Sequence, residues 1–114
     1  MNLLKGDIVD VDLGQPPNEV KGHEQGYNRP CAIIKAFKNL KLAIVIPITS
    51  KQPKYAFYTI VKLEKGSAGL SADSYALCHQ IRTISFDRFL KLRGKLNNRE
   101  ILKINEVLLD TLEV

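Results

Sequence analysis

Two polar residues stand at the ends of neighbouring apolar runs, where chemistry on a phosphate can be built. Arg29, held extended by the proline after it, opens the run 31–35, and Thr49, followed by a serine, closes the run 42–48. If the two runs pair as an antiparallel hairpin, the start of one strand lies beside the end of the other. A guanidinium and a hydroxyl held together can bind a phosphate and stabilise the charge that develops on it. Taken alone, each residue is more typical of a surface ion pair or an ordinary turn.

The two histidines, His23 and His79, are the candidate groups for proton transfer, because histidine is the usual acid or base at neutral pH. His23 lies in the polar stretch 14–28, which is long for a connector in a small domain and therefore a candidate functional loop. Tyr27, in the same stretch, offers an aromatic face on which a nucleic-acid base can stack. An isolated histidine in a loop is more often not catalytic, so both interpretations stay open.

Composition narrows the class of protein. The chain has 114 residues, with 17 lysines and arginines against 12 acidic residues, a net charge of +5 and a pI near 9.3. This length suits one domain, 1–114, and the basic balance favours a polyanionic partner such as nucleic acid. No apolar run approaches the ~18 residues of a membrane-spanning helix. The first residues lack the apolar core of a signal peptide, so a cytoplasmic protein is expected.

The sequence lacks the common motifs of metal-binding and nucleotide-binding sites. No CxxC, HExxH or P-loop motif is present, which predicts that the protein uses neither a metal nor another cofactor. Cys31 and Cys78 both lie inside apolar runs. They are expected to be buried, reduced thiols rather than a disulfide.

Most of the chain has the pattern of short strands. Alternating apolar and acidic residues over 9–13 predict a half-buried strand. The continuous apolar runs 31–35 and 42–48 predict two central strands joined by a polar turn. The stretch 55–63 is rich in aromatic and β-branched residues and predicts a further strand, and 75–84 predicts another extended segment.

The last third of the chain changes to a helical period. Ser85 is a candidate cap for a short helix that ends near Gly94. Asn97 and Glu100 have the spacing of a capping box, in which the two residues exchange hydrogen bonds at a helix start. The apolar residues that follow share one helical face: Ile101, Ile104, Leu108 and Leu112. Strands followed by a terminal helix predict a mainly β protein, a small, strongly bent barrel with a C-terminal helix packed across it.

The order and spacing of several short motifs resemble those of the MazF/PemK/Kid toxins of bacterial type II toxin–antitoxin systems. The resemblance covers nearly the whole chain. It is carried by GDIV at 6–9, GHEQ at 22–25, RP at 29–30, IPITS at 46–50 and QIRTI at 80–84. Aligned on Gln80, however, Leu77 and His79 stand where the Kid-like branch has an arginine and an aspartate. The carboxylate proposed as general base in that branch is therefore missing here.

This resemblance implies an SH3-like barrel, a homodimer, and a metal-independent endoribonuclease that cuts single-stranded mRNA and arrests growth. It also implies a cognate acidic antitoxin, whose complex with the toxin binds its own operator DNA. Arg29 and Thr49 match the positions most consistently tied to catalysis, and His23 matches one assigned to catalysis or RNA contact. Flanking nucleotides are expected to bind a further set of residues: Gln25, Tyr27, Ser50, Lys51, His79 and Gln80.

The expected chemistry uses the nucleophile that RNA itself carries. The 2′-hydroxyl attacks the adjacent phosphate and leaves a 2′,3′-cyclic phosphate and a 5′-hydroxyl. Arg29 and Thr49 are expected to stabilise the phosphorane, and a histidine to transfer the proton. Two alternatives use a similar fold without catalysis, a CcdB-type gyrase-poisoning toxin and a plain SH3-like module that binds nucleic acid or protein. Arg-Pro and Thr-Ser at one strand edge favour the ribonuclease, because neither alternative needs them.

Overall fold

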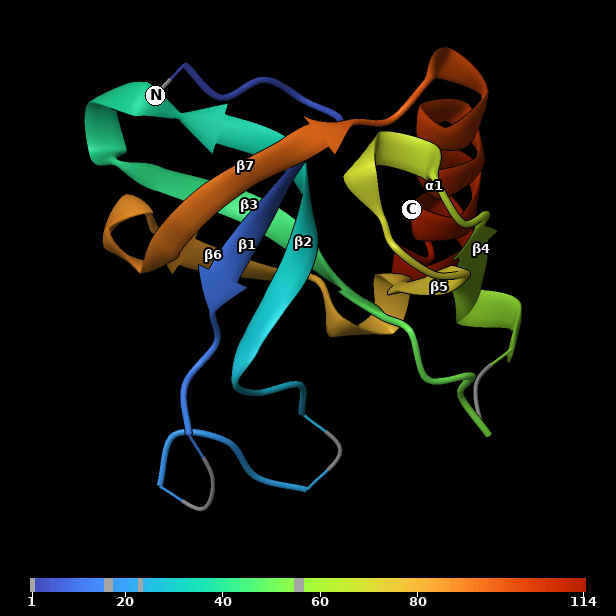
Figure 1. Ribbon diagram of the computed structural model, residues 1–114, viewed down its shortest axis with the longest axis horizontal. Helices are drawn as coiled ribbons and strands as arrows, with labels where there is room; N and C mark the ends of the chain where they lie inside the picture. The colour runs from blue at the N-terminus through green and yellow to red at the C-terminus, as the bar shows by residue number, and fades with distance from the viewer. Residues whose placement is uncertain (1, 16–17, 23, 55–56) are drawn as a thin grey trace.

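The computed structural model describes residues 2–15, 18–22, 24–54 and 57–114. Within these residues, seven strands precede one α-helix, α1 (Asn98–Leu112) (Figure 1). The strands are β1 (Asp7–Asp12), β2 (Asn28–Phe37), β3 (Leu42–Thr49), β4 (Ile60–Leu63), β5 (Ser74–Leu77), β6 (Arg82–Ser85) and β7 (Phe89–Lys95).

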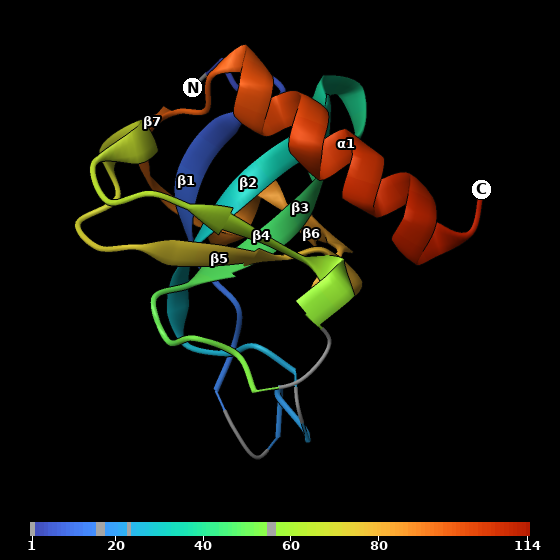
Figure 2. The ribbon, with the colours of Figure 1, turned by 90° about the vertical axis from the view of Figure 1, so that its right-hand side faces the viewer.

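The strands form an antiparallel sheet that bends along β3. Its order is β4-β5-β3-β2-β1-β7, with β6 paired to β3 beside β5. The first half of β3 pairs with β6, and its last residues, Ile48 and Thr49, pair with β5. The helix α1 runs across one side of this sheet (Figure 2). This architecture confirms the prediction of a mainly β, barrel-like protein with a C-terminal helix. The sheet is not closed, because among the described residues β4 and β7 end the order without pairing to each other.

The central strands β2 and β3 are covered on both faces. One cluster of buried side chains packs under α1 and includes Ile8, Ile46 and Leu108, while a second cluster includes Val9 and Val45. Successive side chains of a strand point to opposite faces. Neighbours such as Val45 and Ile46 therefore enter different clusters, which explains why the runs 31–35 and 42–48 are apolar without alternation.

Three of the strand predictions are confirmed and two are corrected. The alternating stretch 9–13 falls largely within β1, where Val9 and Val11 are buried and Asp10 and Asp12 are half-buried. The runs 31–35 and 42–48 lie within β2 and β3, which pair antiparallel with Cys31 opposite Pro47. The strand predicted at 55–63 is confirmed only as β4, because the 3-10 turn η2 (Phe57–Thr59) precedes it; residues 55–56 lie outside the described residues.

The single extended segment predicted at 75–84 is wrong in its middle. The 3-10 turn η4 (Cys78–Gln80) separates β5 from β6, although both strands pair with β3. The interruption falls beside Ile46 and Pro47, between the two paired halves of β3. Proline has no N–H to donate, so continuous pairing is weakest there.

The short helix predicted after Ser85 is wrong beyond its first turn. Ser85 Oγ accepts a hydrogen bond from the Asp87 N–H at 3.1 Å, but this caps only a 3-10 turn, Phe86–Arg88. The chain then forms β7, whose backbone pairs with β1. Gly94 does not end a helix. It lies inside β7, where an added Cβ would come within 2.7 Å of the Ala68 carbonyl oxygen, so close approach of two backbones requires glycine there.

The start and the buried face of α1 agree with the prediction. Asn97 Oδ1 accepts from the Glu100 N–H at 2.8 Å, and Glu100 Oε1 accepts from the Asn97 N–H at 3.0 Å. Ile104 and Leu108 are buried, whereas Leu112, at the end of the stripe, is 49% exposed. Among the described residues, no helix is long and apolar enough to cross a membrane.

Both cysteines are buried free thiols, as predicted. Burial raises the pKa of Cys31 to about 12 and that of Cys78 to about 11. Both thiols therefore stay protonated at neutral pH, and neither is a nucleophile.

Candidate active site

A cleft of about 670 Å³ opens where β2 begins and β3 ends. Its walls come from the loop before β2, the end of β3 and the loop after it, the end of β5, and the turn η4. The lining residues are Gln25, Arg29, Thr49, Lys51, Gln52, Pro53, Lys54, Leu77, His79 and Gln80. The cleft thus brings together six residues predicted from the sequence: Gln25, Arg29, Thr49, Lys51, His79 and Gln80.

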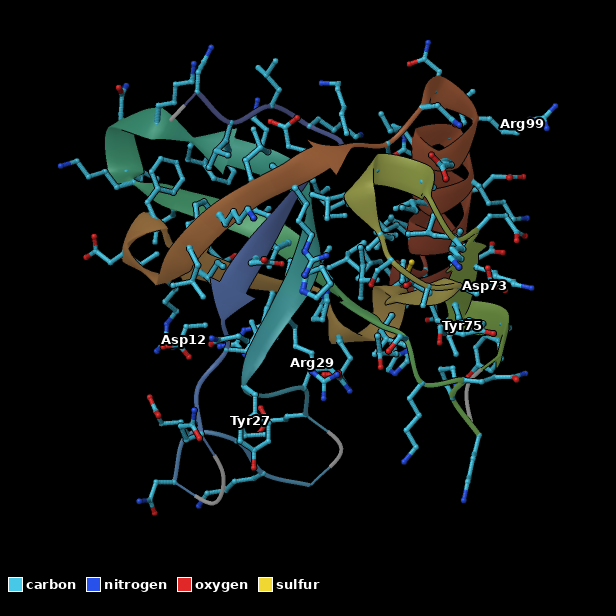
Figure 3. The ribbon with its side chains drawn as sticks, viewed as in Figure 1. Asp12, Tyr27, Arg29, Asp73, Tyr75 and Arg99 are labelled. Carbon is cyan, nitrogen blue, oxygen red and sulfur yellow. The ribbon has the colours of Figure 1, made fainter. Side chains whose placement is uncertain are left out.

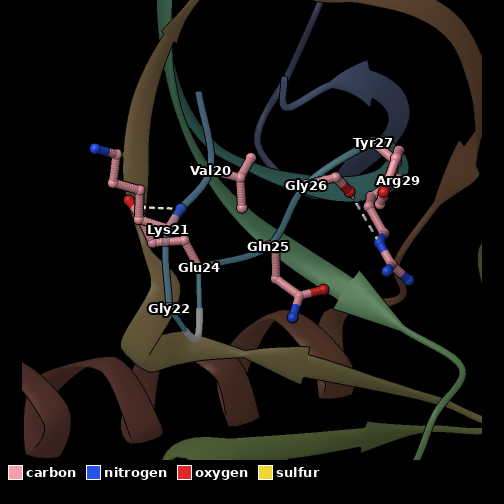
Figure 4. Close-up of a pocket in the computed structure, with 8 residues that line it drawn as sticks. All are labelled: Val20, Lys21, Gly22, Glu24, Gln25, Gly26, Tyr27 and Arg29. Atoms are coloured by element: carbon pink, nitrogen blue, oxygen red, sulfur yellow. Dashed lines mark hydrogen bonds between the residues drawn. The ribbon is translucent and has the colours of Figure 1, made fainter. Parts of the chain in front are cut away.

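Arg29 is held by its own loop. Its Nε donates to the Gly26 carbonyl oxygen at 3.1 Å, and its two terminal nitrogens point away from Gly26 (Figure 4). Gly26 packs so closely on Val20 that an added Cβ would lie 2.8 Å from Val20 Cγ2. A larger residue would therefore displace the carbonyl that orients Arg29. The terminal nitrogens carry the donors that a bidentate phosphate contact needs.

Thr49 lies beside Arg29 at the same edge of the sheet. Continuing the β2–β3 register by two residues from Cys31 and Pro47 sets Arg29 against Thr49. Thr49 is only 7% exposed, and its Oγ1 accepts from the Lys51 N–H at 3.2 Å. Because Oγ1 is the acceptor in that bond, the hydroxyl hydrogen can be donated to a ligand oxygen.

His79 enters the cleft from the turn η4. Its Nδ1 lies 2.7 Å from Thr59 Oγ1, and Thr59 is 4% exposed. Partial burial lowers the pKa of His79 below the ordinary value of 6.5, so the imidazole is neutral at pH 7. Leu77, two residues earlier, is buried and adds an apolar patch to the cleft wall.

The cleft is basic. Arg29, Lys51 and Lys54 line it, and no aspartate or glutamate is among its described lining residues. A cleft lined by one sign of charge attracts the opposite sign. Across the part of the chain that the structure describes, no group of three or more His, Cys, Asp or Glu side chains could hold a metal ion. The donors gathered here suit a phosphate rather than a divalent cation.

A second hollow, of about 580 Å³, adjoins the cleft under the loop before β2 (Figure 4). Gln25 and Arg29 line both spaces. Tyr27 lines this second hollow and not the cleft, and it is 53% exposed. Figure 3 shows its side chain on the loop before β2. Its backbone is pinned with a left-handed φ of 60°, and its N–H donates to the Gly14 carbonyl oxygen at 2.7 Å.

Of the other predicted site residues, one is described and one is not. Ser50 is exposed and lines neither hollow, and His23 lies outside the described residues. Sequence reasoning did not single out Lys54 or Thr59. Lys54 could have been found from its sequence, because it lies in a basic loop with Lys51. Thr59 could not, because its partner His79 lies 20 residues away in the chain.

Comparisons with known proteins give the family and support the fold. The chain matches the family of PemK-like, MazF-like toxins of type II toxin–antitoxin systems over residues 4–112. It is 32% identical over 109 residues to Endoribonuclease MazF of Staphylococcus saprophyticus, covering 93% of this chain and 88% of that protein. It is also 32% identical over 111 residues to Endoribonuclease EndoA of Bacillus subtilis, covering 95% and 92%. The chain belongs to the PemK-like, MazF-like toxin family.

Solved structures share the fold over nearly the whole chain. An endoribonuclease in complex with its cognate antitoxin, from a mycobacterial species, has a TM-score of 0.76 at 18% identity and covers 99% of this chain and 97% of its own. A MazF structure from Deinococcus radiodurans has a TM-score of 0.74 at 20% identity and covers 96% of each chain. These likenesses confirm the toxin-type barrel fold.

Proposed function

We propose that this chain is the toxin of a type II toxin–antitoxin system and acts as an endoribonuclease on single-stranded mRNA. The observation that carries the proposal is that Arg29 and Thr49, at the ends of two paired strands, both line one basic cleft. Family membership and the endoribonuclease names of the relatives support the same activity. Cleavage of mRNA in the cytoplasm stops translation and so arrests growth.

The reaction is an attack by the 2′-oxygen of RNA on the adjacent phosphorus. The 2′-hydroxyl gives up its proton, the bond from phosphorus to the 5′ oxygen breaks, and the 5′ oxygen takes up a proton. Arg29 donates to the phosphate oxygens and stabilises the extra negative charge of the phosphorane. Thr49 donates its hydroxyl hydrogen to the same group. Arg29 is not the base, because a guanidinium does not lose its proton in proteins.

Flanking nucleotides bind along the same cleft. Lys51 and Lys54 supply positive charge for the neighbouring phosphates, and the amides of Gln25 and Gln80 hydrogen-bond base edges. A base that reaches the second hollow stacks on Tyr27. Ser50 stays a predicted RNA contact, and His23 stays predicted for catalysis or RNA contact. Both rest on the sequence resemblance alone.

The chain also acts as a homodimer and pairs with an acidic antitoxin. Support comes from the net charge of +5 and from a structural neighbour that is an endoribonuclease bound to its cognate antitoxin. An acidic antitoxin segment in the cleft would compete with RNA for Arg29 and the two lysines. Binding of operator DNA by the toxin–antitoxin complex rests on the family resemblance alone.

Incubation of the purified protein with a defined mRNA, followed by mapping of the cut ends, tests the activity. We expect 2′,3′-cyclic phosphate and 5′-hydroxyl ends, and the same rate in excess chelator. Arg99→Ala is a matched control, because Arg99 is an exposed arginine on α1, well separated from Arg29 (Figure 3). Intact RNA, or cleavage that stops in chelator and returns with magnesium, would contradict the proposal.

A further inference from the structure

We propose that Thr59 is a positioning residue that fixes His79 as the base of the cleavage reaction. This inference rests on the proposed ribonuclease function and names the group that takes the 2′ proton. It is carried by the 2.7 Å contact between His79 Nδ1 and the buried hydroxyl of Thr59, at the wall of the cleft that holds Arg29 and Thr49.

The chemistry of the cleft leaves a single candidate base among the described lining residues. The lining contains amides, a hydroxyl, cations, a proline and a leucine, but no carboxylate. Lysine and arginine are protonated at neutral pH, and amides do not accept a proton there. His79 alone combines a lone pair with a pKa suited to proton transfer near pH 7.

The hydrogen bond to Thr59 decides which ring nitrogen is available. Nδ1 is engaged by Thr59 Oγ1, so Nε2 is the nitrogen left for the cleft that the ring lines. When Thr59 Oγ1 accepts from Nδ1–H, the lone pair of the neutral ring lies on Nε2. The same bond persists when Nε2 gains a proton, because Nδ1–H is a donor in both states. An acceptor at Nδ1 therefore suits a base.

Tertiary packing keeps this pair in place. Thr59 ends the turn η2 immediately before β4, and His79 lies in η4 immediately after β5, which pairs with β4. The helix α1 contacts both turns. Its buried residues Ile104 and Leu108 belong to the same cluster as Cys78, the neighbour of His79. Thr59 is thus a fixed, buried partner for a ring that is otherwise exposed.

The charged groups on the elements around His79 are mainly exposed. Arg29, Lys51 and Lys54 line the same cleft, and β4 contributes Lys62, which is paired with Asp73 at 3.9 Å. The strand β3, also packed on η4, has no charged residue. The charged residues of α1 beyond its first turn are all exposed: Lys103, Glu106 and Asp110. Burial of the ring is therefore the cause that lowers the pKa of His79.

In the proposed step, Nε2 of His79 takes the proton of the 2′-hydroxyl as the 2′-oxygen bonds to phosphorus. The 5′ oxygen leaves with the electron pair of its bond to phosphorus and takes a proton from water. The hydroxide formed is neutralised by the proton that His79 returns to solvent. Atoms and charge balance without an oxidant, a metal or a further reactant.

Single-turnover cleavage rates test the role of each residue. We expect His79→Gln to lose about 10²–10⁴-fold, the usual contribution of a general base. Thr59→Val should lose about tenfold, and Thr59→Ser, which keeps the hydroxyl, should restore the rate. Thr111→Val is the matched control, because Thr111 Oγ1 donates to Val107 within α1 and lies outside the cleft lining. In the His79→Gln background, Thr59→Val should cause no further loss.

Equal losses from Thr59→Val with and without His79 would overturn the inference, because Thr59 would then act only on structure. The pH profile is a second readout. The wild-type rate should fall as pH drops through a value below 6.5, and this limb should disappear in His79→Gln. An unchanged limb in His79→Gln would also overturn it.

Nitrogen NMR of the two imidazoles tests the positioning without RNA. The spectrum of His79→Gln assigns the signals, since His23 is the other histidine of the chain. We expect neutral His79 to carry its proton on Nδ1 in the wild type and in Thr59→Ser. A proton on Nε2 in the wild type would overturn the inference even if Thr59→Val failed to fold. If wild-type protein left RNA intact while the tautomer was as expected, the proposed function would fail and the positioning would stand.

Discussion

The cleft holds its proposed phosphate donors, Arg29 and Thr49, and its proposed base, His79, in place in different ways. On one side, Arg29 is bound by a carbonyl three residues earlier, and Thr49 by the N–H of Lys51, two residues later. On the other side, His79 is held by Thr59, 20 residues earlier in the chain. We call these the Arg29 side and the His79 side. The proposed phosphate donors are thus positioned by local contacts, and the proposed base is positioned by tertiary packing.

The same difference appears in the supporting elements. The Arg29 side stands on β2 and β3, central strands whose two faces enter separate buried clusters. The His79 side stands on the 3-10 turns η2 and η4, which α1 contacts from the far end of the chain. Changes on the Arg29 side should therefore affect the rate with little effect on folding. Changes that loosen α1 should affect folding and the His79 side together.

On the Arg29 side, the largest expected effect is the loss of a phosphate donor. Arg29→Ala and Thr49→Val should each lower the single-turnover cleavage rate by about 10²–10³-fold or more, because each removes a preorganised donor to the phosphorane. The unfolding transition should stay close to that of the wild type, because both residues lie at the ends of their strands and neither belongs to the buried apolar clusters. Folded Arg29→Ala with nearly the wild-type rate would show that the site lies elsewhere.

The next effect concerns the support of the His79 side. Leu108→Ala should lower the free energy of unfolding by about 2–5 kcal/mol, as for other buried leucines. Leu109→Ala is the matched control: Leu109 is the next residue on the same helix, is 56% exposed, and should change stability by less than about 0.5 kcal/mol. Urea unfolding measures both. Equal small changes would mean that α1 does not brace the turns.

The central hairpin could be predicted because its cause is local. Two continuous apolar runs with a polar turn between them specify two neighbouring strands buried on both faces. The pairing of Cys31 with Pro47 then sets Arg29 beside Thr49. The capping box could be predicted for the same reason, because its partners Asn97 and Glu100 lie within one helical turn. This is why the Arg29 side of the site followed from residue types and spacing.

The turns and β7 could not be predicted because distant partners decide them. The segment 89–95 had a candidate helix cap before it, but pairing with β1 makes it a strand. The break between β5 and β6 depends on their shared partner β3. Thr59 gave no signal, because its value to His79 exists only once β4 and β5 have paired. His79 was a candidate from its residue type alone, whereas its partner Thr59 was found only in the structure.

A smaller effect concerns the binding of RNA by Lys54, in the loop after β3. Affinity for a 2′-deoxy oligonucleotide, which cannot be cleaved, should fall in Lys54→Ala for every sequence tested. The slope of log affinity against log salt should decrease by about 0.7, the value for one phosphate contact on a single strand. Lys103→Ala is the matched control, because that exposed lysine lies on α1 outside the cleft lining. Equal salt slopes in the two variants would remove Lys54 from the RNA path.

The smallest expected effect is the pH dependence of folding that His79 contributes. Partial burial lowers its pKa below 6.5 in the folded protein, so the unfolded chain binds this proton more readily. The resulting stability is complete above pH 6.5 and is lost as pH falls from there through the folded pKa. Because His79 is exposed, the change is slight. Urea unfolding between about pH 7.5 and 5 should show a larger loss for wild type than for His79→Gln. Identical losses would mean that the His79 side leaves the ring as hydrated as it is in the unfolded chain.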